Sequence, residues 1–288
     1  MSVHLIKTAW GLVGTGNRYA TLFDFVESAR DEQYVGVEFP VFYMDLEDGG
    51  AAGVAGPLRE HIESLGLDYI ALIATRTEHW GDHDAHLASF REQCELAASM
   101  GAQRAAVHAG ADSFDENRAR LFLEDCRRIA LDLGVQPCFE THRGRILFNP
   151  FICARMLEQI PDLELTSDLS HWLLVVDRIP NDIMGLFDHA SERSRHLHAR
   201  IGHEKSPQVT EPADPFWEQH VSLYRRWWQI SVDAAQAAGS VLSISPEFGP
   251  PPYMHAEPFT QKPSGDIVAA NNWMRDQLRD WFKEETTT

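Results

Sequence analysis

The sequence is poor in cysteine and contains no long apolar run. Only four of its 288 residues are cysteines, and none of them has a CxxC spacing: Cys94, Cys126, Cys138 and Cys153. The position of these residues inside periodic segments is typical of buried, reduced thiols, so we expect them to be packing residues. No stretch approaches the roughly 18 consecutive apolar residues of a membrane span.

The sequence also lacks an export signal and an excess of positive charge. Its N-terminus has no basic leader followed by an apolar run, so we expect a cytoplasmic protein without membrane contacts. It has 43 acidic residues against 25 lysines and arginines, a formal net charge of −18. Such a field repels polyanions, which argues against nucleic acid as a partner. Segment 11–16 (GLVGTG) lacks the spacing of a dinucleotide fingerprint, so no nucleotide cofactor is expected.

The composition that is present is that of a globular protein with a large core. Hydrophobic residues make up 44% of the chain and charged residues 24%. These fractions are ordinary for a folded, water-soluble chain, so disorder is excluded. The length of 288 residues matches the size at which a closed α/β barrel forms one unit. We therefore expect residues 1–288 to form a single domain.

Short β-branched or aliphatic runs alternate with segments of helical periodicity. The eight strand candidates are 4–10, 34–39, 69–74, 104–108, 135–140, 163–167, 196–201 and 241–247. The clearest helical patterns are 82–100, 114–133, 215–238 and 265–282. Gly101, Gly134 and Gly239 stand where a left-handed residue commonly ends a helix. The alternation indicates βαβ units, and it predicts an α/β protein of the (β/α)8 TIM barrel type, with an open doubly wound sheet as the alternative.

Polar residues stand near the predicted C-terminal ends of the later strands, where a (β/α)8 barrel brings side chains together. Glu140, Asp168 and Glu247 each follow an apolar run, and His198 lies on the seventh strand candidate. Three crowded carboxylates repel one another unless a divalent cation neutralises them. We therefore predict one metal ion, bound by these four residues. The alternative pairs each acid with a nearby base, for example Glu140 with Arg143 and Asp168 with His171.

The predicted ligand set of three carboxylates and one imidazole is rich in oxygen. Such a set favours Mn²⁺ as the first choice, with Mg²⁺, Co²⁺ or Zn²⁺ as other candidates. The metal would be the protein's cofactor.

The order of several short motifs resembles the xylose isomerase-like TIM barrel superfamily, in particular its sugar phosphate isomerase and epimerase branch around D-tagatose 3-epimerase. The motifs are Gly36-Val-Glu38, His108-Ala-Gly110, Glu140, Asp168-Leu-Ser-His171, Leu197-His198-Ala-Arg200 and Pro246-Glu247-Phe-Gly249. The resemblance spans nearly the whole chain. It implies the same four metal ligands, it makes the two glutamates the catalytic acid and base, and it assigns His171 to a substrate oxygen.

The sequence departs from the resembled family at two points. Arg200 lies only two residues beyond His198, nearer than the arginine that helps to hold the substrate in the epimerases. The Asp-x-His pair that follows the seventh strand in the related apurinic endonucleases is missing, which argues against DNA repair. The first departure concerns the residues that would clamp the substrate. Segments 140–145 and 202–208 match none of the epimerases whose sugar is known, so the identity of the sugar does not carry over.

The resemblance implies a metal-dependent sugar isomerase or epimerase that moves a proton next to a carbonyl through an enediolate. We expect the sugar to be held by a set of histidines, arginines and one tryptophan: His171, Arg200, His108, Arg143 and Trp10. Arg143 and Arg145 would form a further cationic edge if the substrate carries a phosphate or a carboxylate. One alternative is a lyase or dehydratase acting on a keto-sugar or keto-glycoside, and another is a non-catalytic sugar-binding barrel. The aromatic cluster Trp217, Tyr224, Trp227 and Trp228 is expected either to cover the barrel or to form the contact of a homodimer.

Overall fold

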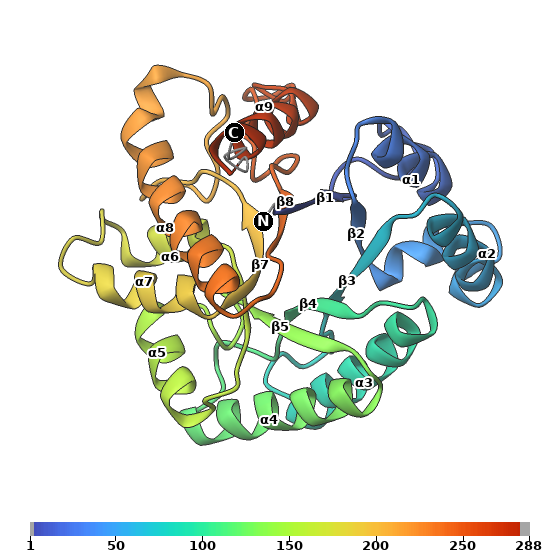
Figure 1. Cartoon of the computed structure of the whole chain (residues 1–288), viewed down its shortest axis with the longest axis horizontal. Helices are drawn as coiled ribbons and strands as arrows, with labels where there is room; N and C mark the ends of the chain where they lie inside the picture. The colour runs from blue at the N-terminus through green and yellow to red at the C-terminus, as the bar shows by residue number, and fades with distance from the viewer. Residues whose placement is uncertain (1–2, 283–288) are drawn as a thin grey trace.

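A computed structural model of the chain, which describes residues 3–282, contains a closed barrel of eight parallel strands (Figure 1). The strands are β1 (His4–Thr8), β2 (Gly36–Pro40), β3 (Asp68–Ala74), β4 (Arg104–His108), β5 (Gln136–Glu140), β6 (Leu165–Ser167), β7 (Ser194–Ala199) and β8 (Ser243–Pro246). Strand β1 pairs with both β2 and β8, so the sheet has no free edge. The predicted (β/α)8 TIM barrel is confirmed, and the open doubly wound sheet is excluded.

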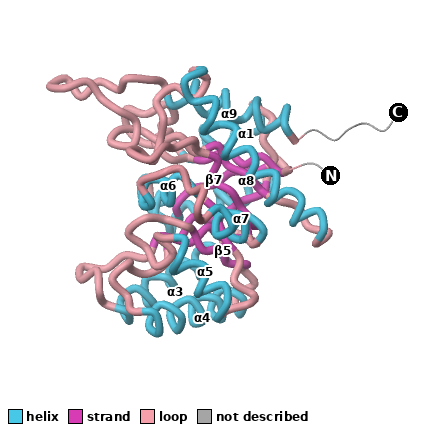
Figure 2. Tube along the Cα trace, turned by 90° about the vertical axis from the view of Figure 1, so that its left-hand side faces the viewer, coloured by secondary structure: helices cyan, strands magenta, loops and turns pink. Residues whose placement is uncertain are grey.

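Helices surround the barrel, and most of them follow a strand. They are α1 (Leu22–Asp31), α2 (Gly50–Ser64), α3 (His83–Ser99), α4 (Glu116–Asp132), α5 (Pro150–Gln159), α6 (Leu169–Val176), α7 (Met184–Glu192), α8 (Glu218–Ala237) and α9 (Ile267–Trp281), with short 3₁₀ helices η1 (Val41–Leu46) and η2 (Pro215–Trp217). Figure 2 shows the strands in the interior with helices on the outside. Gly101, Gly134 and Gly239 have positive φ angles of 79°, 77° and 64°, as their predicted place after a helix requires.

Five of the predicted strands have at least one boundary that is wrong by two residues; among them, β2, β6 and β8 begin two residues later than predicted. The first strand ends at Thr8 rather than at residue 10, because the chain turns there and the Leu12 amide donates to the Ala9 carbonyl. Strand β7 covers 194–199 rather than 196–201. Its ladder ends where Ala199 pairs with Pro246, since a proline has no amide hydrogen with which to continue it. Arg200 therefore lies just beyond the strand, at the mouth of the barrel.

The aromatic cluster of α8 lies inside the protein. Tyr224, Trp227 and Trp228 are buried, and the Trp227 ring stacks on Phe187 of α7 with ring centroids 4.8 Å apart. Removing one such side chain from water is worth roughly 1.5–3 kcal/mol, so these rings fasten α7 and α8 to the barrel. They are not available as a subunit contact, whereas Trp217 is only partly buried and packs against this core. The homodimer stays a prediction.

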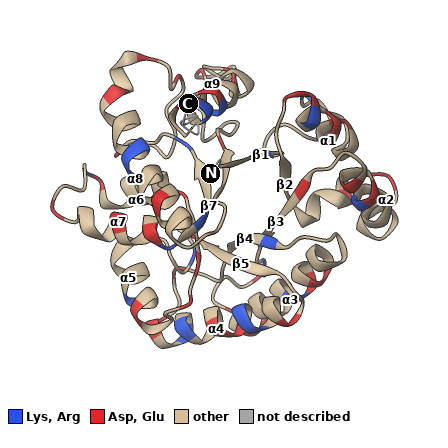
Figure 3. Ribbon diagram, viewed as in Figure 1, with Lys and Arg blue, Asp and Glu red and all other residues tan. Residues whose placement is uncertain are grey.

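Acidic side chains are spread over the outer surface, and the apolar side chains lie beneath. Figure 3 shows Asp and Glu on the outer helices, with Lys and Arg among them. The four cysteines are buried and unpaired, as predicted. Within residues 3–282, no helix has both the length and the apolar character that crossing a membrane requires.

Candidate metal centre and cavity

A cavity of about 370 Å³ lies at the C-terminal ends of the strands. Its wall is formed by Trp10, Pro40, Phe42, Tyr43, Leu72, Ala74, Arg76, His108, Glu140, His142, Arg145, Arg200, Glu247 and Tyr253. Loops after the strands supply most of these residues, because parallel strands all end at this face of the barrel. One side of the cavity is aromatic and apolar, and the other carries acids, imidazoles and guanidinium groups.

The three predicted carboxylate ligands stand where three different strands end. Glu140 is the last residue of β5, Asp168 directly follows β6, and Glu247 directly follows β8. All three are buried, with at most 6% of their surface exposed. Asp168 also caps helix α6, because its Oδ1 accepts from the amide of Ser170 at 3.0 Å. Its Oδ2 is left free of that role and faces the site.

His198 is held with one ring nitrogen facing the carboxylates. Its Nε2 lies 2.9 Å from Glu38 Oε1, so that nitrogen donates to the Glu38 carboxylate. Its Nδ1 lies 3.4 Å from Glu140 Oε2 and 3.3 Å from Glu247 Oε2. Both this Nδ1 and Glu140 Oε2 are buried and make no hydrogen bond of regular geometry among the described residues, although His108 Nε2 lies 2.5 Å from Glu140 Oε2. One imidazole nitrogen and two carboxylate oxygens thus converge on one point, an arrangement that either a proton on Nδ1 or a bound cation satisfies.

The four predicted ligands form two overlapping groups. Ligand atoms of Asp168, His198 and Glu247 all lie within 4.8 Å of one another, and so do those of Glu140, Asp168 and His171. Glu140 reaches the first group through its 3.4 Å contact with His198. The structure therefore brings the four residues together. Three carboxylates and an imidazole fit a hard or borderline divalent cation.

The pKa values of His198 and Glu247 are both raised in this buried cluster, which contains more acidic than basic groups. Burial lowers the pKa of His198, but Glu247, Glu38 and Glu140 outweigh burial and raise that pKa well above its ordinary value. Burial raises the pKa of Glu247 to about 8, against the effect of His198. In the absence of metal His198 and Glu247 therefore attract protons, which a divalent cation would displace, whereas the neighbouring His108 and His198 outweigh burial and hold the pKa of Glu140 well below its ordinary value.

Arg200 lies among the predicted ligands. Its guanidinium contacts Asp168 Oδ2 and lies 3.3 Å from Glu247 Oε2, and its Nε donates to Ser170 Oγ at 3.2 Å. The side chain is 2% exposed. His171 is fully buried beside it, with Nε2 3.2 Å from an Arg200 nitrogen and 3.6 Å from Asp168 Oδ2. Arg200 thus offsets part of the acidic charge and holds two carboxylates in place.

Of the remaining residues that were predicted to bind substrate, some line the cavity and one does not. Trp10, His108 and Arg145 line the cavity, and His108 Nε2 lies 2.5 Å from Glu140 Oε2. The guanidinium of Arg143 lies 4.9 Å from the centre of the Tyr253 ring and is not part of the cavity wall. Arg143 consequently supports the Tyr253 loop.

Sequence reasoning did not identify three residues of the site: Glu38, His196 and His142. Glu38 is fully buried and accepts from Ser245 at 2.5 Å as well as from His198, while His196 Nε2 lies 3.3 Å from the same carboxylate. Burial raises the pKa of Glu38, but the two imidazoles outweigh it and hold that pKa far below its ordinary range. An available signal was the His-x-His spacing on β7, which places both rings on one face of the strand.

His142 lies between two other histidines. Its ring centroid is 4.4 Å from that of His108 and 4.1 Å from that of His171. Burial and the neighbouring His108 lower the pKa of His142 well below its ordinary value, so the ring is neutral and available as a hydrogen-bond partner or a ligand. No sequence pattern pointed to it, because it follows Glu140 in a loop of irregular structure.

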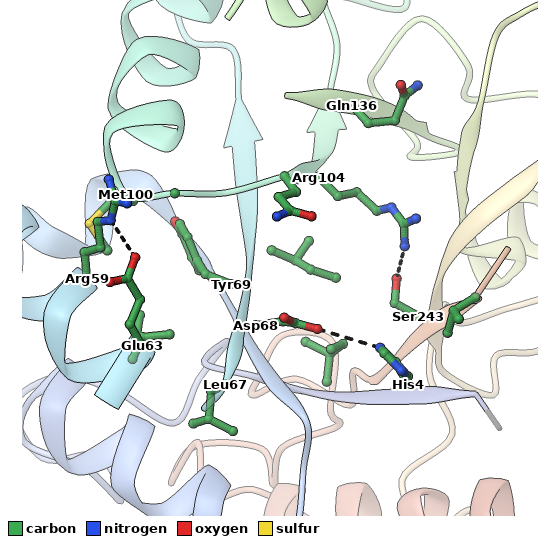
Figure 4. Close-up of a pocket in the computed structure, with 16 residues that line it drawn as sticks. His4, Arg59, Glu63, Leu67, Asp68, Tyr69, Met100, Arg104, Gln136 and Ser243 are labelled. Carbon is green, nitrogen blue, oxygen red and sulfur yellow. Dashed lines mark hydrogen bonds and ion pairs between the residues drawn. The ribbon is translucent and has the colours of Figure 1, made fainter. Parts of the chain in front are cut away.

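A larger cavity, of about 490 Å³, lies at the opposite end of the barrel (Figure 4). Its charged groups are mostly paired: Arg59 Nε lies 2.8 Å from Glu63, His4 lies 3.7 Å from Asp68, and Arg104 donates to Ser243 Oγ at 2.9 Å. In TIM barrels this N-terminal face carries stability rather than chemistry. The smaller cavity, with its buried carboxylates and imidazoles, is the candidate site.

Comparison with known proteins supports the fold. No family model matches the sequence, and no curated protein matches it. Three solved structures that resemble the chain are D-allulose 3-epimerase from Methylomonas sp. in complex with D-allulose (TM-score 0.65, 10% identity, 98% of each chain), the IOLI protein with a bound zinc atom (TM-score 0.65, 13% identity, 100% of each chain) and the probable 3-DHS dehydratase AsbF from Bacillus anthracis (TM-score 0.58, 11% identity, 86% of this chain and 93% of that one).

These structures are xylose isomerase-like TIM barrels, and this chain has the same fold over nearly its whole length. The resemblance that the motifs indicated is therefore confirmed for the fold. Sugar epimerases are among the proteins that share it.

Proposed function

We propose that this protein is a divalent-metal-dependent sugar isomerase or epimerase in which Glu140 and Glu247 transfer the proton next to the substrate carbonyl. The observation that carries the proposal is the convergence of buried ligand atoms at the centre of the site, where His198 Nδ1 lies 3.4 Å from Glu140 Oε2 and 3.3 Å from Glu247 Oε2. A non-catalytic sugar-binding barrel would not need a buried carboxylate on each side of the His198 imidazole.

The metal would be held by Glu140, Asp168, His198 and Glu247, with Mn²⁺ as the first choice. When bound, the cation would polarise the substrate carbonyl and stabilise the negative charge that develops on its oxygen. The protein's own residues then carry out the proton transfer.

The two glutamates approach the cavity from different strands, β5 and β8, with His198 of β7 between them. In the proposed reaction one carboxylate removes a carbon-bound proton while the other delivers one, which requires both to come within hydrogen-bond reach of the reacting carbon. Arg200 and His171 would hold substrate oxygens, and Arg200 would also keep Asp168 and Glu247 in place. Trp10 and Tyr253 would close the site against water, since their rings pack together with centroids 4.8 Å apart.

The test is exchange of substrate hydrogen with deuterated water over a panel of ketoses, using protein reconstituted with Mn²⁺. We expect exchange with the wild type and a loss of about 100- to 10,000-fold with Glu140→Gln or Glu247→Gln, the range that acid–base catalysis supplies. Glu63→Gln, a half-exposed acid at the opposite end, is the control and should keep full activity. Exchange that survives both substitutions in metal-loaded protein contradicts the roles of the two glutamates.

A lyase or dehydratase would begin with the same proton abstraction and then expel a leaving group. The fold is shared with a probable dehydratase as well as with epimerases, so product analysis has to separate the two classes. An isomer of equal mass supports the first proposal. A product that has lost water or an alcohol supports the lyase.

A further inference from the structure

Two arginines stand in the wall of the cavity without acidic partners. Arg76 and Arg145 both line it, and neither has a carboxylate within 4.0 Å among the residues that the structure describes. Several other arginines also lack a carboxylate partner, whereas Arg155 pairs with Glu116 at 2.8 Å and Arg226 pairs with Asp188. What distinguishes Arg76 and Arg145 is that both line the same cavity as the predicted metal ligands Glu140 and Glu247.

Arg145 is held firmly in its position. Its Nη1 donates to the carbonyl of Thr75 at 2.8 Å and to that of Gly110 at 3.2 Å, and the guanidinium lies 4.7 Å from the centre of the Trp80 ring. Its Nε and Nη2 have no hydrogen-bond acceptor within the described part of the chain. Because the bonds of Nη1 fix the planar group, two donors are held ready for a ligand at little cost in side-chain entropy.

Arg76 supplies the second cation from a more exposed place. It follows β3, and its guanidinium lies 3.5 Å from the centre of the Phe42 ring, which also lines the cavity. The stacking orients the plane of the guanidinium while its nitrogens stay open to solvent. Burial lowers the pKa of Arg145 to about 10, and repulsion by Arg76 adds to this effect, while Glu140 and Asp112 act in the opposite direction without forming an ion pair with Arg145.

The acids in the cavity wall do not offset this charge once the metal is bound. Only Glu140 and Glu247 among the lining residues are acidic, and both are assigned to the metal. A divalent cation and Arg200 would match the charges of Glu140, Asp168 and Glu247. The two arginines would then remain as an unbalanced positive pair inside a strongly acidic protein, which otherwise repels anions.

We propose that the substrate carries an anionic group, a carboxylate or a phosphate, and that Arg76 and Arg145 bind this group while the carbonyl end of the same molecule lies beside Glu140 and Glu247. This inference rests on the proposed function and narrows its substrate class to acidic sugar derivatives. Guanidinium groups bind both anions through paired hydrogen bonds. The aromatic side of the cavity, with Trp10 and Phe42, would contact the carbon chain between the two ends.

The test measures binding and exchange separately on metal-loaded protein. The probes are three ketoses that differ only at the carbon farthest from the carbonyl: a neutral hydroxymethyl group, a carboxylate or a phosphate. Calorimetry gives the dissociation constants, and deuterium exchange gives the chemistry. The variants are Arg76→Gln and Arg145→Lys, with Arg91→Gln as the control because Arg91 is an exposed arginine on α3, outside the cavity wall.

We expect at least one acidic ketose to bind about tenfold or more tightly than the neutral one, and each variant to lose about ten- to a hundredfold of that affinity while its binding of the neutral ketose is unchanged. Arg91→Gln should bind all three probes like the wild type. The two acidic probes distinguish carboxylate from phosphate. Arg76→Gln tests the idea even if Arg145→Lys fails to fold, since Arg76 is exposed.

Equal binding of all three ketoses, absence of binding of both acidic ones, or a preference for the anion that survives Arg76→Gln would overturn the inference. Exchange with the neutral ketose alone would leave the proposed isomerase standing and remove the acidic substrate. Tight binding of an acidic ketose without any exchange would support the anion site and contradict the proposed isomerase activity.

Discussion

The two ends of the barrel differ in how deeply their charged side chains are buried and in whether the charges are paired. At the C-terminal end, Glu140, Asp168 and Glu247 are nearly fully buried and share too few cations. At the N-terminal end, His4 and Asp68 pair while 42% and 68% of their side chains remain exposed. Because water already solvates His4 and Asp68, their ion pair contributes little to the stability of the protein. Buried, unbalanced charge is what marks the functional end of this barrel.

A chain of hydrogen bonds through the barrel interior connects the two ends. Arg104 donates to Ser243 Oγ at 2.9 Å, Ser243 Oγ lies 2.7 Å from His196 Nδ1, and His196 Nε2 lies 3.3 Å from Glu38 Oε2. Glu38 then accepts from His198 at 2.9 Å. The proton positions along this chain follow from its ends, since an arginine only donates and a carboxylate only accepts. His198 Nδ1 is therefore left without a proton when a metal is bound.

The largest expected difference between the ends is in metal affinity. Asp168→Asn keeps the oxygen that caps α6 but removes the charge of a predicted ligand, so we expect Mn²⁺ affinity to fall by more than about a hundredfold, beyond the range of an outer-shell change. Calorimetric titration of the metal-free protein measures it. Asp68→Asn at the opposite end is the matched control and should bind Mn²⁺ like the wild type; equal losses in both variants would erase the distinction between the ends.

A smaller loss of metal affinity is expected at Glu38, which contacts His198 rather than the metal. Glu38→Gln should lower Mn²⁺ affinity by about ten- to a hundredfold, because an amide cannot accept equally from both imidazoles and no longer fixes the protonated nitrogen of His198. Nitrogen NMR of the His198 ring reads this tautomer directly. An unchanged tautomer together with weakened metal binding would mean that Glu38 acts only through packing.

The smallest effect on the metal is expected at the N-terminal end of the hydrogen-bond chain. Arg104→Met removes donors to Ser243 and to the Arg195 carbonyl, so we expect the free energy of unfolding to fall by about 1–2 kcal/mol. Mn²⁺ affinity should change by less than about twofold, since Glu38 still holds His198. Urea unfolding and metal titration measure the two quantities, and a loss of affinity as large as that of Glu38→Gln would show that the two ends act as one site.

The sequence predicted the barrel and the placement of four polar residues well, because both follow from local regularities. Short apolar runs spaced by helical segments identify the strands, and parallel strands end at a common face. Glu140, Asp168 and Glu247 could therefore be expected to meet before any coordinates were known. Their service as metal ligands stays a proposal, to be decided by the titrations above.

The contacts that complete the site depend on side chains far apart in the chain. Glu38 lies 160 residues before His198, and nothing near either residue indicates that they bond at 2.9 Å. The same holds for Arg76 and Arg145, whose lack of acidic partners is visible only when the surroundings of the cavity are known.

By itself, the sequence determined the order of the elements, the acidic surface and the set of residues at each strand end, because these depend on periodicity and composition. The tertiary structure decided which of those residues share charge, which ring nitrogen of His198 faces the acids and which cations remain unpaired. Such properties depend on the distances between side chains of separate strands and on how deeply these side chains are buried. Electrostatic energy depends on the separation of the charges and on the polarity of their surroundings, and not on position along the chain.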